Sequence, residues 1–447
     1  MIVSYKVEIY NIHKEVKCAL ADTLSLYKRA INYVCTIIYF NWDDICVIEK
    51  QLDKLTYIEN LIHTTKDNKA KYKAFDCLFY KMPAYIRRDV QRVAFGHISS
   101  FMNNLKNYQD KRYKAISNGK KFKEKSPTLN LEPNIMPTFY KNAMYKPSEN
   151  NSINLKLYNG KTWDYYTLSL KSTDCKYLKR FDENTFKNPQ LQFKNNKFYI
   201  KYIIEEPDKL LKTKLLPYRK VMSVDLGINT HATCVIMDSN GTIIARKFIT
   251  DTTDKDRLNF LLQKKRELQR QSGRWGFAPL THIQHKINCY NTAIENYVSH
   301  EIIELALKYD VAVIVFEYLS KFRGKSSEKI HYWRKKAIIK KVSYKSHFYG
   351  MRYSTVTPRN TSRLAFDGSG YAERGDNIKL SFSRKKNIVA RSFSVCKFKN
   401  KKFYNCDLNA AYNIGARYLY REYRKDNPDL DKSQSHVVLN DIWQLAG

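Results

Sequence analysis

The chain has 447 residues, of which 43% are hydrophobic, so it can fold around sizeable cores and is not a disordered tail. Its formal net charge of +36 exceeds what solubility requires, and such an excess is costly unless a polyanion is bound. Aromatic residues make up 14% and offer flat faces for unpaired bases. We therefore expect a nucleic-acid partner. No amphipathic anchor or membrane-length apolar stretch argues for a membrane partner.

Nine cysteines are scattered along the chain without a CxxC pair, a pattern typical of reduced thiols. The first residues contain no apolar stretch of signal-peptide length. These two features predict a cytoplasmic protein, and the expected nucleic-acid partner predicts association with the nucleoid. They leave the oligomeric state open.

The N-terminal part begins with alternating apolar and polar residues over 1–12, which predicts one strand. Residues 13–118 have a helical pattern, with Pro83 in the first turn of one helix. Basic residues lie on the face of that helix opposite its apolar stripe. They either contact nucleic acid or form a solvated surface. These residues are Arg87, Arg88 and Arg92.

Residues 119–215 begin with a Lys-, Pro- and Asn-rich connection and continue as two predicted β-hairpins. The hairpins turn at Asn159-Gly160 and Asn195-Asn196, and the first of these pairs is strongly favoured in tight turns. Basic outward residues on both hairpins suggest a small barrel or curved sheet. The strand at 1–12 would complete it.

Residues 216–358 predict three antiparallel strands, two helices near 254–271 and 281–308, and a short apolar strand in VAVIVF. A helix through Tyr344 and Lys345 and a strand in MRYSTVTP follow. Residues 359–403 look irregular, 404–425 form a closing helix, and 426–447 read as a polar tail. This order of elements is expected of a ribonuclease H-like fold.

Three acids interrupt or end apolar segments of this region. Asp225 lies inside the first strand, Glu317 ends VAVIVF, and Asp407 opens the closing helix. An unpaired charge in such a place is expensive, and three converging carboxylates would repel one another unless a divalent cation joined them. Two bridged Mg²⁺ ions could then promote in-line phosphodiester displacement. Each acid alone would more often be a strand-end or capping residue.

Other polar residues have more than one interpretation as well. Asn409 and Asn413 lie near the same helical face and either orient ligands, contact phosphate or cap the structure. His282, His285 and Cys289 share one helical face, but a closed zinc site needs a fourth ligand, which the sequence does not supply.

The segments SVDLGI, VFEYL and NCDLNAAYNIGARYL resemble the three RuvC motifs of the transposon-encoded TnpB nucleases, relatives of the compact type V CRISPR effectors. The stretch YKSHFYGMRYSTVTPRNTS is similar to the family's run before its zinc ribbon. The likeness is specific in the C-terminal half. The N-terminal half is similar only in layout.

The resemblance implies a multidomain α+β protein with an RNase H-like RuvC nuclease domain, a helical recognition lobe and a β-barrel wedge domain. It implies an RNA-guided DNA endonuclease that takes a guide RNA and target double-stranded DNA as partners and reads a short flanking motif. Asp225, Glu317 and Asp407 match the family's catalytic acids, which hold two Mg²⁺ ions. Residues 1–12 and 119–215 would be the wedge, 13–118 the recognition lobe, and 216–358 with 404–425 the RuvC domain.

One departure from the family concerns its zinc ribbon, which carries two CxxC pairs. Residues 359–403 keep Cys396 but have Ala365, Gly368 and Lys399 where the other cysteines would stand. Cys396 and Cys406 cannot supply four ligands. The segments AFDGSG and NCDLNA resemble those of a TnpB branch from elements that also encode a serine recombinase. We therefore expect a degenerate ribbon without zinc.

Several basic residues near the predicted catalytic sheet are candidates for phosphate contact, with a solvated surface as the alternative for each. Trp275 and Trp333 either stack on bases or pack internally. The basic candidates are Lys264, Lys265, Arg270, Arg274, Lys321, Arg323, Lys325 and Lys345.

Three rival functions stay open at this level. They are a nuclease-inactive, RNA-guided DNA-binding regulator, a transposase or resolvase of the same fold, and a plain RNA-binding protein. The presence of all three acids disfavours the first, and the basic N-terminal half disfavours a minimal resolvase.

Overall fold

The computed structural model describes residues 1–79, 82–119, 121–129, 136–148, 151–207, 219–227, 230–250, 252–272, 278–318, 334–375, 379–381, 389–391, 394–430 and 432–447. The chain divides into two compact units, Met1–Pro207 and Asp208–Gly447. Each unit has hydrophobic cores of its own.

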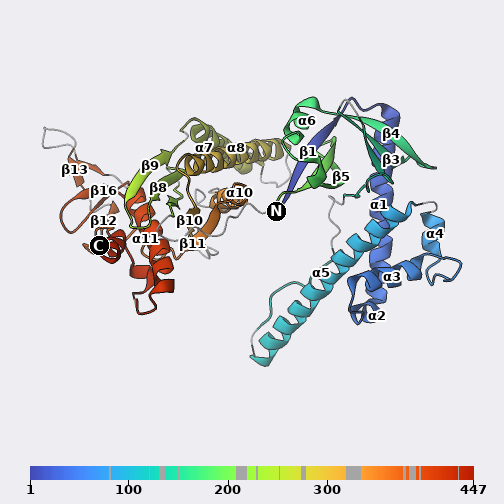
Figure 1. Ribbon diagram of the computed structural model, residues 1–447, viewed down its shortest axis with the longest axis horizontal. Helices are drawn as coiled ribbons and strands as arrows, with labels where there is room; N and C mark the ends of the chain where they lie inside the picture. The colour runs from blue at the N-terminus through green and yellow to red at the C-terminus, as the bar shows by residue number, and fades with distance from the viewer. Residues whose placement is uncertain are drawn as a thin grey trace. The chain divides into compact units, whose positions relative to one another are not determined.

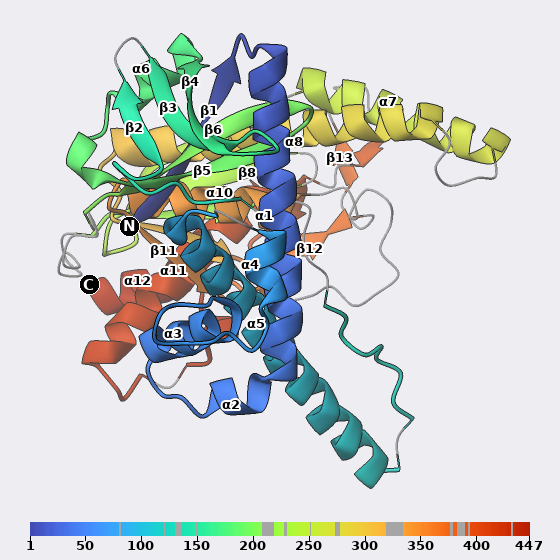
Figure 2. The same cartoon turned by 90° about the vertical axis from the view of Figure 1, so that its right-hand side faces the viewer.

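Two long helices dominate the helical part of the first unit (Figures 1 and 2). They are α1 (Lys14–Phe40) and α5 (Ala84–Ser117), which pack against each other through their apolar stripes. Pro83 precedes the first residue of α5 and does not lie in its first turn. Shorter helices flank the pair, namely α2 (Trp42–Cys46), α3 (Gln51–Ile62) and α4 (Ala74–Leu78). The predicted helical region is therefore confirmed.

A six-stranded antiparallel sheet forms the rest of this unit, in the order β2-β3-β4-β1-β6-β5. Its strands are β1 (Ile2–Tyr10), β2 (Tyr145–Ser148), β3 (Ser152–Tyr158), β4 (Trp163–Leu170), β5 (Phe186–Lys194) and β6 (Lys197–Glu205). Both predicted hairpins are confirmed, and β1 joins them by pairing with β6 along most of its length and with β4 at its end.

The predicted β-barrel is not confirmed, because the strand order of this sheet is open. Among the described residues its outer strands, β2 and β5, do not pair with each other. Pairing of β5 with β6 shifts register between Lys187 and Gln190, and Pro189 inside that shift has no N–H to donate. The outer edge of β5 instead pairs with the segment that precedes β2, through an isolated bridge between Thr138 and Gln190, and β2 itself is only four residues long.

The second unit is built on a five-stranded sheet in the order β11-β10-β7-β8-β9. Its strands are β7 (Val221–Asp225), β8 (Ala232–Met237), β9 (Ile243–Ile249), β10 (Val313–Glu317) and β11 (Arg352–Val356). The first three are antiparallel, whereas β10 runs parallel to both β7 and β11. The predicted strand order is thus confirmed, and the apolar sequence of β10 reflects burial on both faces.

Helices cover both faces of this sheet. α8 (Ala278–Lys308) and α10 (Lys335–Phe348) pack on one face, and α7 (Thr252–Ser272) lies alongside α8 (Figures 1 and 2). α11 (Cys406–Asp426) packs on the other face, where Gly415 leaves room for the Met237 side chain of β8. None of the helices in the described ranges combines the length and apolarity needed to cross a membrane.

Two C-terminal regions are more ordered than the sequence indicates. Residues 359–403 contribute β12 (Glu373–Arg374), β13 (Lys379–Ser381), β14 (Val389–Arg391) and β15 (Val395–Lys397), and β16 (Phe403–Asn405) follows them. The expected polar tail contains α12 (Leu439–Ala446), which packs on α11 and buries Leu439 and Ile442. The tail is therefore part of the core of the second unit.

Candidate active site

Asp225 and Glu317 are the last residues of two neighbouring parallel strands, β7 and β10. Their registers place the two acids in the same row, so only one strand spacing of about 4.8 Å separates their backbones. Side chains of a strand alternate between faces, and the alternate residues Val221 and Val313 belong to the core beneath α11. Both acids therefore project on the α11 side of the sheet.

Asp407 reaches the same edge of the sheet from α11. Asn405 is the N-cap of this helix, and its side-chain oxygen accepts hydrogen bonds from the backbone N–H groups of Asp407 (2.9 Å) and Leu408 (3.0 Å). The Asp407 carboxylate also accepts a hydrogen bond from the side chain of Thr230, in the connection after β7. The helix start is thus held close to the ends of β7 and β10.

The three acids act on one another electrostatically. Burial, together with the nearby charges of Glu317 and Asp407, raises the pKa of Asp225 to about 7 against the opposing charges of two basic residues. Burial also raises the pKa of Asp407, while Arg374 opposes that shift. The structure therefore brings together the three acids singled out in the sequence.

Two basic residues missed in the sequence lie at the same place. Burial lowers the pKa of Lys335 to about 8, but the charges of all three acids counteract this shift. The guanidinium of Arg374 stabilises the ionised forms of Asp225 and Asp407. Lys335 begins α10 and Arg374 ends β12, so neither position is marked by a motif near the acids in sequence.

The donor chemistry of this edge suits a hard divalent cation, because carboxylate oxygens are the ligands that Mg²⁺ takes. Within the ranges that the structure describes, however, no three acidic, histidine or cysteine side chains are assembled closely enough to hold one metal ion. Like charges repel at short range when no cation lies between them. Shared coordination would require the carboxylates to rotate toward one another.

A hydrogen-bonded chain orients Glu317. The Thr361 hydroxyl lies 2.5 Å from Glu317 Oε1, and the backbone carbonyl of Thr361 accepts a hydrogen bond from Asn413 Nδ2 at 2.8 Å. Asn413 is fully buried on α11. One helix thus carries both an acid, Asp407, and the amide that holds the residue beside Glu317. Thr361 was not predicted, since 44 residues separate it from its partner.

Asn409 has an internal role in this structure, which favours the structural alternative over nucleic-acid contact. Its side chain is 1% exposed. Its amide nitrogen donates to the carbonyl of Leu364 (2.8 Å), and its oxygen accepts from the backbone N–H of Phe366 (2.9 Å). Because donor and acceptor are both used, Asn409 fastens the 364–366 segment to α11.

The predicted basic contacts divide into engaged and exposed side chains. Arg87 pairs with Glu59 at 2.7 Å, and Arg92 pairs with Asp89 at 2.5 Å, so both are used within the first unit. Lys265 donates to Gln284 (2.7 Å), and Lys345 donates to Ser299 of α8 (3.0 Å). The exposed members are Arg88, Lys264 and Arg270. Arg274, Trp275, Lys321, Arg323, Lys325 and Trp333 lie outside the described residues.

The histidine and cysteine residues of α8 form only a pair. Cys289 Sγ lies 3.6 Å from His285 Nε2, one helical turn away. No third ligand accompanies them within the described part of the chain.

An apolar core occupies the place of the expected zinc ribbon. β12, β15 and β16 form a three-stranded sheet over Ala365, Cys396, Phe398 and Cys406. Phe398 stacks on Tyr404 with ring centroids 4.6 Å apart, and Phe366 packs edge-on against both rings. The hydrogen bond with Cys406 and burial raise the pKa of the Cys396 thiol, which therefore stays protonated at neutral pH.

The chain is similar to one protein family over part of its length and to several solved structures. The profile of the Aq_aa04 family matches residues 3–159. No curated protein sequence matches the chain. The solved structure of the mini-RNA-guided endonuclease CRISPR-Cas_phi3 is similar at a TM-score of 0.51, with 10% identity over 94% of this chain and 92% of that chain.

Two further structures are similar at lower scores. A Cas12f1–sgRNA–target DNA complex has a TM-score of 0.34 and 17% identity over 93% of this chain and 99% of that chain. C2c1 of Alicyclobacillus acidoterrestris, in complex with single-guide RNA, has a TM-score of 0.45 and 10% identity over 91% of this chain and 67% of that chain. The likeness to CRISPR-Cas_phi3 shows that this chain shares the mixed α+β fold of that endonuclease.

Proposed function

We propose that this protein is an RNA-guided DNA endonuclease of the TnpB type, with Asp225, Glu317 and Asp407 as its catalytic acids. The observation that carries the proposal is their meeting at one sheet edge, where burial and the charges of Glu317 and Asp407 raise the pKa of Asp225. Groups that destabilise one another in this way cluster at functional sites. The shared fold with an RNA-guided endonuclease supports the same conclusion.

The three carboxylates would hold two Mg²⁺ ions, which when bound supply a water nucleophile and stabilise the leaving oxygen of a phosphodiester. The residues of the chain contribute orientation and charge. Thr361 holds one oxygen of Glu317, and Thr230 binds the Asp407 carboxylate. Lys335 and Arg374 reduce the repulsion among the acids.

The partners that we propose are a guide RNA and a target double-stranded DNA. A net charge of +36 favours a polyanion, and the CRISPR-Cas_phi3 structure is of an RNA-guided endonuclease. Base pairing with the guide would select the target, while the protein would read a short flanking motif. Within the TnpB type we favour the serine-recombinase-linked branch, because of AFDGSG and NCDLNA.

We also propose that the 359–403 region functions without zinc. Its fold is stabilised by the aromatic cluster of Phe366, Phe398 and Tyr404. The two buried thiols are too few for a closed four-ligand site, which leaves the region unable to form the usual structural zinc centre.

The experiment is a cleavage assay with the full chain purified together with its RNA. A plasmid library carrying the guide match and randomised flanking bases is incubated with Mg²⁺, and the cut ends are sequenced. We expect cuts beside one common flanking motif. Glu317→Ala should reduce cutting more than about 10³-fold. Glu304→Ala removes an exposed carboxylate from α8 and serves as the matched control.

The outcomes separate the rival functions. Target binding without cutting by the unmodified chain would indicate a nuclease-inactive regulator. Cutting that persists after the RNA is digested would indicate a transposase or resolvase. RNA binding without any effect on DNA would leave a plain RNA-binding protein. Equal cutting by Glu317→Ala and the unmodified chain would overturn the assignment of the acids.

A further inference from the structure

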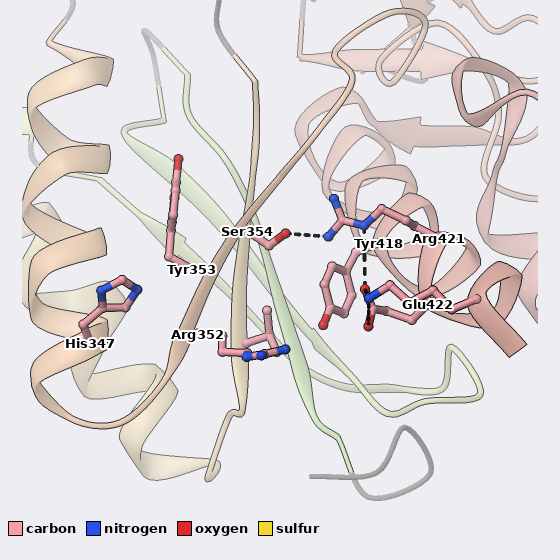
Figure 3. Close-up of a pocket in the computed structure, with 9 residues that line it drawn as sticks. His347, Arg352, Tyr353, Ser354, Tyr418, Arg421 and Glu422 are labelled. Atoms are coloured by element: carbon pink, nitrogen blue, oxygen red, sulfur yellow. Dashed lines mark hydrogen bonds and ion pairs between the residues drawn. The ribbon is translucent and has the colours of Figure 1, made fainter. Parts of the chain in front are cut away.

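Two adjoining hollows lie along β11, the outermost strand of the five-stranded sheet. The smaller, of about 250 Å³, begins at Glu317 and Tyr318 and is bounded by α10. The larger, of about 360 Å³, lies between β11, the end of α10 and α11 (Figure 3). Tyr353 lines both. We call the pair the edge hollows.

Basic side chains from three elements line the edge hollows. Among the described residues, Lys336, Lys340 and Arg352 have neither a hydrogen-bonding partner nor an ion pair for their side chains, so their charges are available to a ligand. Apart from Glu317, the acid that lines them is Glu422, which already pairs with Arg219 and Lys425. The hollows therefore carry an uncompensated positive charge, which favours phosphate.

Aromatic rings accompany these charges. Tyr318 directly follows Glu317 and is 61% exposed. Tyr353 is half-buried, and its ring centroid lies 6.0 Å from that of Phe316, which restrains it. Bases stack on such rings only when they are unpaired. The combination of free cations and accessible rings thus fits a single strand better than a duplex.

The free edge of β11 is closed to an added protein strand. Arg421 donates to the backbone carbonyl of Thr355 (3.0 Å) and to the Ser354 hydroxyl (2.6 Å), as Figure 3 shows for Ser354. A peptide that extended a sheet would need such edge carbonyls for its own backbone N–H groups. A side chain already bonded along the edge disfavours that mode and leaves the basic hollow as the usable feature.

We propose that the edge hollows bind one single nucleic-acid strand and lead it along β11 to Glu317. This inference deepens the proposed function and depends on it in naming the strand as the substrate. From Val313 to Glu317 the hollows follow the five residues of β10, whose four steps span roughly 13 Å. Phosphates would contact Lys336, Lys340 and Arg352, and bases would stack on Tyr318 and Tyr353.

The test is photo-crosslinking of the full chain to a short single-stranded DNA that contains 5-bromodeoxyuridine, in chelator so that nothing is cut. We expect crosslinks in peptides that contain Tyr318 or Tyr353. A triple variant, Lys336→Ala, Lys340→Ala and Arg352→Ala, should reduce these crosslinks about tenfold. Its logarithmic salt dependence of binding should be shallower by about 2, since each single-strand phosphate contact contributes about 0.7.

The control variant removes three exposed lysines elsewhere in the same unit, Lys286→Ala, Lys308→Ala and Lys402→Ala. It should keep the crosslinks at the edge hollows, because its charge matches that of the triple variant while its hollows are intact. Tyr318→Phe should bind normally, whereas Tyr318→Ala should bind roughly tenfold more weakly. Circular dichroism verifies that each variant is folded.

Two outcomes would overturn the inference. One is a set of crosslinks that avoids β11 and α10. The other is an equal loss of crosslinks at the edge hollows in the triple and control variants, which would reveal only a general charge effect. Failure of the proposed function looks different, since DNA would then remain uncut in Mg²⁺ although the strand crosslinks at the hollows.

Discussion

The second unit contains two sites of opposite character, a cluster of carboxylates and an apolar core. At the sheet edge, three carboxylates meet although burial and their mutual repulsion raise the pKa of Asp225 to about 7. At the three-stranded sheet, where the resemblance to TnpB proteins leads one to expect four metal-binding thiols, Phe366, Phe398 and Tyr404 form an apolar core. Unfavourable charge is kept where chemistry would need it, whereas a purely structural centre can be exchanged for packing.

The largest expected effect comes from Asp225→Asn. Target cutting should fall more than about 10³-fold, because an amide cannot replace an ionised ligand. Thermal stability in chelator should rise, since the variant removes a carboxylate whose ionised form the fold disfavours. We expect the melting temperature to rise by about 2–4 °C for each kcal/mol gained in the free energy of unfolding, as measured by differential scanning calorimetry.

The pH dependence of this gain follows from the sign of the shift. The folded-state pKa of Asp225 lies above its unfolded value, so the unmodified chain is penalised most above about pH 7. The advantage of Asp225→Asn should therefore be full above that pH and shrink as the pH falls toward 4. A stability gain of Asp225→Asn that grew as the pH fell would contradict the electrostatic account of the site.

A large effect on stability without a direct effect on chemistry is expected from Phe398→Ala. The ring is 2% exposed and contacts both Phe366 and Tyr404, so its removal should cost about 3–5 kcal/mol in the free energy of unfolding. Urea denaturation measures the loss. Phe398→Leu keeps much of the volume and should recover most of the stability. If Phe398→Ala left the free energy of unfolding unchanged, packing would not be what stabilises this region.

A smaller effect on activity is expected from Thr361→Val. The substitution preserves shape but removes the hydroxyl that lies against Glu317 Oε1. Cutting should fall about tenfold, in line with roughly 1.4 kcal/mol for one hydrogen bond to a charged group. Thr361→Ser keeps the hydroxyl and should act almost as the unmodified chain. If valine and serine variants cut equally fast, Thr361 does not orient Glu317.

The smallest effect is expected from zinc removal. Dialysis against a strong zinc chelator should leave the melting temperature unchanged in Mg²⁺-free buffer if, as we propose, the 359–403 region is held by aromatic packing without zinc. Elemental analysis should find no stoichiometric zinc. One bound zinc per chain, with a lowered melting temperature after chelation, would refute the zinc-free proposal.

The positions of the acids were predictable because each marks the end of a locally coded element. VMSVD and VIVFE are apolar strands whose final residue is charged, and Asn405 with Asp407 forms a helix start. The helical and hairpin regions of the first unit were predictable for the same reason. Closure of its sheet was not, because closure depends on whether distant outer strands meet in register.

Residues that act through distant contacts escaped prediction. Lys335 and Arg374 approach the acids, and Thr361 approaches Glu317, across separations that leave no periodic signal in the sequence. Asn409 was noticed for its helical position, but only its buried hydrogen bonds to the 364–366 segment favour a structural role over phosphate contact. The 426–447 segment looked like a tail because α12 buries only a few residues, although these complete the core over α11.

The sequence by itself determined the strands, the helices and which acids stand at their ends, since backbone hydrogen bonding and side-chain periodicity operate over a few consecutive residues. Only the tertiary structure decided that α11 lies across the sheet with Asp407 beside Asp225, and that the edge of β11 is hollow and basic. The packing of sheet against helix, through contacts such as Gly415 against Met237, sets these distances, and it joins residues far apart in the chain.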